Sequence, residues 1–174
     1  MNIKNIDQLT NDLASILDEL IGQQVDLHDV VRAKLEAMRR ADTDEMTMLS
    51  HREGGIAAQV NELEQRRRQV TSEFASALSF PIHTGIEYLS LPVLAERLEE
   101  RHRTRLTRLG AALREKMLQV AEANRVVELV SREMLAHFDN LFSVFTQDEN
   151  EPRIYSRGGA MEDGAGAKVL DAVG

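Results

Sequence analysis

The stretch "MTMLSHREGGIAAQVNELEQRRRQVTSEFASA" (residues 46–77) repeats with alternating spacings of three and four residues. The repeated positions are Met46, Leu49, Glu53, Ile56, Val60, Leu63, Arg67, Val70, Phe74 and Ala77, with no slip between them. This spacing is typical of a helix that packs through a coiled-coil seam. Glu53 and Arg67 interrupt its apolar character, and we expect such charges to fix the register or to leave room for a partner. Gly54 and Gly55 each cost about 1 kcal/mol relative to Ala inside a helix, so the helix should be soft there.

The segments on either side have the same rhythm. Leu9, Leu13 and Leu17 begin an earlier amphipathic pattern that continues to Met38. Asp42 or Thr43 is a suitable cap for the helix that follows. The prolines of "SFPIHTGIEYLSLP" (79–92) then end it. We expect helices at about 5–40, 43–78 and 92–145, which make residues 1–146 an all-α, elongated, antiparallel three-helix coiled-coil hairpin or bundle.

The composition changes after Phe145, where glycines, acids and small residues become frequent. Such a segment buries too little apolar surface to order itself, so we expect a disordered, flexible tail over 147–174. Within it, "NEPRIYSRGGAM" (150–161) places Tyr155 between a proline and two glycines. A tyrosine offers a large amphipathic contact area with few torsions to order, which suits a short docking motif.

Several classes of function are disfavoured by the composition. The net charge of −8 opposes general binding to nucleic acid, which depends on accumulated Lys and Arg. The absence of cysteine removes disulfides and thiolate metal sites. The N-terminus lacks a secretory pattern, and no apolar run reaches the roughly 18 residues that a membrane span requires. We therefore expect a cytoplasmic protein without membrane insertion.

No group of residues predicts catalysis. A di-metal site in a helical bundle needs two Glu-x-x-His pairs, and only Glu99 and His102 have that spacing. The glycine pairs do not form a phosphate-binding loop, and the serines and histidines show no nucleophile pattern. We expect a protein that is not an enzyme and that uses no metal and no cofactor.

An apolar surface is the remaining candidate. In "VVELVSREMLAHFDNLFSVF" (126–145) the apolar stripe is wider than a coiled-coil seam requires, which suits an amphipathic partner helix. Packing against residues 80–90 or a homodimer contact would use the same surface. The candidate binding residues are Val127, Val130, Met134, Leu135, Phe138, Leu141, Phe142 and Phe145.

Three segments carry a resemblance to a known family. They are "VRAKLEAMRRADTDEMTMLSHREGGIAAQVNELEQRRRQV" (31–70), "EANRVVELVSREML" (122–135) and "IYSRGGAM" (154–161). Together they make the chain resemble the flagellar export chaperones of the FlgN type. The linker 79–92 is not distinctive, and the residues beyond Met161 match no part of the family pattern.

The resemblance implies a cytoplasmic type III export chaperone. Such a chaperone holds hook-associated proteins of the hook–filament junction by their C-terminal helical segments and docks at the export gate protein FlhA. In the family the C-terminal part of the long helix takes the client, which corresponds here to 126–145, and a tail tyrosine, here Tyr155, engages the gate. The alternative from the residues alone is a structural coiled-coil homo-oligomer that acts as a scaffold without a client.

Overall fold

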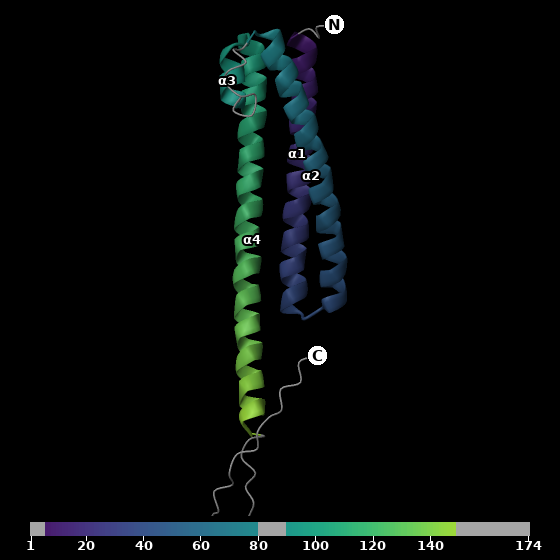
Figure 1. The fold of residues 1–174 in the computed structure, drawn as a ribbon, viewed down its shortest axis with the longest axis vertical. Helices are drawn as coiled ribbons and strands as arrows, with labels where there is room; N and C mark the ends of the chain where they lie inside the picture. Colours follow the sequence, from purple (N-terminus) through teal and green to yellow (C-terminus); the bar gives the residue numbers. More distant parts are fainter. Residues whose placement is uncertain (1–5, 80–89, 149–174) are drawn as a thin grey trace, which may run out of the picture. The chain divides into compact units, whose positions relative to one another are not determined.

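The structure is a computed structural model that describes residues 6–79 and 90–148. These residues form four helices: α1 (Ile6–Arg39), α2 (Thr43–Ala77), α3 (Leu91–Glu96) and α4 (Glu100–Asp148) (Figure 1). Within these two ranges there is no strand, and the all-α prediction is confirmed. None of the helices in this part of the chain has an apolar stretch that could span a membrane. The chain divides after Ser131 into two units, so α1, α2, α3 and the first part of α4 belong to one unit and the rest of α4 to the other.

The helices α1 and α2 form an antiparallel hairpin. They lie side by side in Figure 1. Glu19 of α1 pairs with Arg66 of α2, and Lys34 of α1 pairs with Glu53 of α2. The pair nearer the turn joins residues that are closer together in the sequence, as an antiparallel arrangement requires. The turn is short because Ala41 adopts a positive φ of 53° and Asp42 caps α2. The Asp42 carboxylate accepts a hydrogen bond from Glu45 N at 3.0 Å, which satisfies one of the backbone donors that a helix start leaves unpaired.

The described residues of the first unit form two apolar clusters, and Val60 packs against both. The first joins the beginning of α1 to the end of α2, to α3 and to the beginning of α4. Its largest fully buried side chains include Phe74, Leu9, Leu13, Leu94 and Leu106. The second lies nearer the turn and draws its buried residues, Val30, Ala37, Leu49 and Ile56, from α1 and α2 alone. The first cluster therefore positions α4, while the second belongs to the hairpin.

One helix over 92–145 was expected, and the structure corrects this by dividing the segment. The helix α3 ends at Glu96 and α4 begins at Glu100. The Arg103 side chain donates hydrogen bonds to the backbone oxygens of Ala95 (3.2 Å) and Leu98 (3.0 Å), and Ala95 O also accepts from Leu98 N at 3.1 Å, so the break is held by backbone and side-chain donors together. Leu98, buried inside the break, packs into the first cluster. Burial of apolar side chains on both sides of the break thus outweighs the helix propensity of the sequence there.

The beginning of α4 runs parallel to α1. Arg101 Nη2 donates to Asp7 Oδ1 at 2.7 Å, and one turn later Arg105 Nη1 donates to Asn11 Oδ1 at 2.7 Å. Four residues further along α4, the partner is also four residues further along α1, so the two helices run in the same direction. Close packing between α3 and α4 occurs at Gly110, where an added Cβ would lie 2.5 Å from Leu91 Cδ2.

Candidate functional site

All eight residues of the predicted binding surface lie on α4. Val127 and Val130 belong to the first unit, and both are half-buried. In the second unit Met134 is half-buried, and the next large apolar side chains are exposed. The exposed fractions are 64% for Leu135, 51% for Phe138, 42% for Leu141 and 70% for Phe142. Phe145 is part of α4, but its side chain lies outside the part of the chain that the structure describes.

The described members of the second unit share one side of α4. Met134, Leu135, Leu141 and Phe142 are each three or four residues from Phe138, and residues at these spacings are neighbours on a helix surface. We call this set, with Val127 and Val130, the α4 apolar face. Leu129 does not belong to it: nine residues separate it from Phe138, which is about two and a half turns and puts it on the opposite side of the helix.

The α4 apolar face continues the spacing of the buried residues nearer the start of the helix. Leu106 is fully buried in the first cluster, and Val120 is 6% exposed. From there the burial decreases in sequence order through Val127 and Val130 to Phe138. The same helical pattern therefore supplies core residues in its first turns and solvent-exposed residues in its last turns. A large exposed apolar patch of this kind is typical of a binding surface.

A groove between α1 and α4 lies within the first unit, next to the N-terminal end of this face at Val127. It has a volume of about 380 Å³, and its lining includes Val31 and Leu35 from α1 and Ala123 and Val126 from α4. His28, Arg32, Gln119 and Glu122 complete the lining. Sequence reasoning missed the α1 side of this groove, because α1 and α4 are distant in the sequence and no local pattern specifies that they pair.

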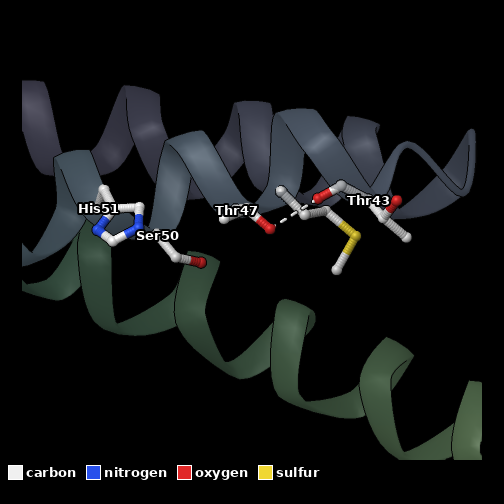
Figure 2. Close-up of a pocket in the computed structure, with 5 residues that line it drawn as sticks. Thr43, Thr47, Ser50 and His51 are labelled. Atoms are coloured by element: carbon white, nitrogen blue, oxygen red, sulfur yellow. Dashed lines mark hydrogen bonds between the residues drawn. The ribbon is translucent and has the colours of Figure 1, made fainter.

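A second hollow lies along the first turns of α2. Figure 2 shows Thr43, Thr47, Ser50 and His51 on one side of the helix, and Met46 completes the lining. Thr47 Oγ1 donates a hydrogen bond to the backbone oxygen of Thr43 at 2.9 Å. The lining contains hydroxyl groups and one imidazole but no carboxylate to orient it, so this set of side chains does not form an acid–base pair.

Glu99 and His102, the two residues with the spacing of a metal site, do not belong to a metal-ligating cluster in the described part of the chain. His102 Nε2 lies 2.8 Å from Asp7 Oδ1, and Arg101 contacts the same carboxylate. His102 therefore lies at the contact between the start of α4 and the start of α1, where Arg101 donates to Asp7. Among the residues that the structure describes, no three metal-ligating side chains of the His, Cys, Asp or Glu type are gathered. Tyr155 and the motif 150–161 lie outside the described residues.

The model of the FlgN protein family matches residues 1–163 of the chain. The chain belongs to the FlgN family. The FlgN match includes α1 to α4, the whole α4 apolar face and Tyr155. Comparison with curated proteins and with solved structures gives no further match. FlgN proteins are flagellar export chaperones that bind hook-associated proteins, and this chain has the general role of a flagellar export chaperone.

Proposed function

We propose that this FlgN protein holds a hook-associated protein in the cytoplasm and delivers it to the export gate protein FlhA. The client would place the apolar side of a C-terminal helical segment on the α4 apolar face. The observation that carries this assignment is the row of exposed Leu and Phe side chains at Leu135, Phe138 and Phe142 in a helix whose first turns form core. A helix laid into an apolar surface is a common way of recognising an amphipathic segment.

The energetics favour a long contact. Complete burial of one Leu or Phe side chain contributes about 1.5–3 kcal/mol, and these side chains are already part-covered. Association costs roughly 4–15 kcal/mol before a net affinity remains. The exposed end alone would therefore bind weakly. We assign Val127, Val130 and Met134 to the same contact, so that the client covers the half-buried part of the face as well.

Delivery is assigned to a separate segment. The FlgN match extends past Tyr155, which follows α4 in the sequence and is not part of the α4 apolar face. We assign Tyr155 to contact with FlhA, which leaves the helix available for the client. Two partners could then be held at the same time by two segments of one chain.

The client site is tested by a pair of matched substitutions. Phe138→Asp and Leu129→Asp each place a charge at an exposed apolar position of α4, 51% and 57% exposed, on opposite sides of the helix. Calorimetric titration with a purified hook-associated protein should show at least about tenfold weaker binding for Phe138→Asp, which corresponds to about 1.4 kcal/mol. Leu129→Asp should stay within about twofold of the unmodified protein. Equal effects of the two substitutions would refute the assigned face.

The gate contact is tested with Tyr155→Ala. This variant should bind the client as the unmodified protein does and should bind the cytoplasmic part of FlhA more weakly. Loss of both activities to the same extent would place Tyr155 in the client site instead.

A client-free scaffold is the competing function, because a second copy could also cover the α4 apolar face. Light scattering distinguishes the two. A scaffold should form a stable homo-oligomer that ignores hook-associated proteins, whereas a chaperone should form a complex of defined stoichiometry with one of them.

A further inference from the structure

The end of the chain carries an apolar pattern of its own. In "AGAKVLDAV" (165–173), Ala165, Val169 and Val173 recur every four residues, and Leu170 lies beside them. At helical spacing Lys168 and Asp171 fall on the other side. The FlgN match ends at residue 163, so this segment lies outside the part of the chain that the family membership explains.

We propose that residues 165–173 are an internal competitor for the α4 apolar face: they cover the exposed end around Phe138 when no client is bound, and the client displaces them. The inference rests on the proposed function for the identity of the displacing partner. The proposal names one occupant, a segment of the same molecule. It also assigns a function to the apolar residues of 165–173, which belong neither to the described helices nor to the motif around Tyr155.

Chain length allows this contact. Residues 149–164 separate the end of α4 from the segment and span up to about 50 Å at roughly 3.3 Å per residue. The stretch of α4 from Leu135 to Asp148 is about 20 Å long at 1.5 Å per residue. The segment can therefore fold back along the whole exposed end of the face with length to spare.

Tethering makes a weak contact effective. A segment held by a linker of this length has an effective concentration on the order of millimolar near its own α4, so even a millimolar intrinsic affinity populates the covered state substantially. Val169, Leu170 and Val173 bring less apolar area than an amphipathic client helix would, and the client therefore wins at saturation. Covering by the segment should lower the apparent client affinity about two- to tenfold.

The contact can be observed without any client. The chain contains no cysteine, so Ala172→Cys provides a single attachment site for a nitroxide spin label. In the labelled protein the methyl NMR signals of Leu135 and Leu141 should broaden, while those of Leu129, on the opposite side of α4, should broaden less. Adding Leu170→Asp should remove the broadening. Absence of broadening in the labelled protein would overturn the proposal.

A mixing control separates the segment from a second copy. Spin-labelled protein without isotope is mixed with isotope-labelled protein that carries no nitroxide. If the signals broaden in the sample whose molecules carry both nitroxide and isotope, but not in the mixed sample, the contact is intramolecular. Broadening in the mixed sample that grows with concentration would overturn it in favour of association between copies.

Competition is measured with a purified hook-associated protein. Leu170→Asp should tighten client binding about two- to tenfold, and the matched control Asp171→Asn, on the polar side of the segment, should leave it unchanged. Unchanged binding by Leu170→Asp would overturn the competition. If the nitroxide contact persists while Phe138→Asp leaves client binding intact, the tail contact stands and the proposed client site is the part that fails.

Discussion

Lys34 Nζ lies 2.7 Å from Glu53 Oε2 and joins α1 to α2 beside the second apolar cluster. The two side chains are 24% and 29% exposed, so the ion pair is partly shielded from water. Glu53 is one of the two charged positions in the seam of residues 46–77, and its partner supplies the physical reason for the charge. A slip of α2 by one turn would separate the two groups and leave both partly buried without a partner, which is costly.

The Lys34–Glu53 pair should therefore contribute measurably to stability. In a double-mutant cycle with Lys34→Met and Glu53→Gln, followed by urea denaturation, we expect a coupling of about 0.5–1 kcal/mol, at the upper end of the range for exposed pairs. The control is Glu36–Arg39, which has the same 2.7 Å distance but side chains that are 57% and 59% exposed. Its coupling should stay below about 0.5 kcal/mol, and equal couplings would contradict the shielding argument.

The glycines of α2 and α4 should respond differently to a methyl group. A Cβ at Gly54 would meet open space, so Gly54→Ala should raise the free energy of unfolding by about 0.5–1 kcal/mol through helix propensity and loss of unfolded-state freedom. A Cβ at Gly110 would lie 2.5 Å from Leu91 Cδ2, so Gly110→Ala gains less or loses stability, because Leu91 must move. Chemical denaturation of the two variants tests the difference, and equal gains would argue against close packing of α3 on α4.

The cap of α2 is a third test of local structure. Asp42→Ala removes the carboxylate that accepts a hydrogen bond from Glu45 N, and we expect a loss of about 1 kcal/mol in the free energy of unfolding. Asp42→Asn keeps an oxygen acceptor at the same place and should lose much less. If both variants lose the same amount, the charge of Asp42 and not its hydrogen bond is responsible.

The two parts of α4 should differ in their contribution to stability. Leu106 is fully buried, and Leu106→Ala should cost about 2–5 kcal/mol through lost burial and the cavity left behind. Leu141 is 42% exposed, and Leu141→Ala should stay within about 0.5 kcal/mol. Thermal and urea denaturation measure both. A large loss at Leu141 would mean that the α4 apolar face is already part of a core and is not available to a client.

The helices were largely predictable from the sequence because their signals are local. The three-four spacing and Asp42 placed the first two helices at about 5–40 and 43–78, and the structure has α1 at Ile6–Arg39 and α2 at Thr43–Ala77. The division between α3 and α4 was missed. The residues there are good helix formers without Gly or Pro, and the only signal was the gap of eight residues between the apolar positions Leu98 and Leu106.

The candidate site was predictable only in part, for a related reason. The width of the apolar stripe identified the residues of the α4 apolar face, but periodicity cannot distinguish an exposed stripe from a core stripe. The burial of Leu106 against the exposure of Phe138 required the structure. The contribution of Val31 and Leu35 to the adjoining groove also depends on a pairing between distant helices, which no local pattern encodes.

The position of the second apolar cluster has a consequence for the order of folding during synthesis. All its members, buried and half-buried, lie between Leu27 and Val60, so it can form as soon as the α1–α2 hairpin has left the ribosome. At roughly 5–20 residues per second, the last turns of α4 follow about 4–14 s later, whereas local helical contacts form within milliseconds. The phenylalanines at the end of α4 thus leave the ribosome only after the α1–α2 hairpin has had time to fold, so the nascent chain does not expose both apolar sets in an unfolded state at once.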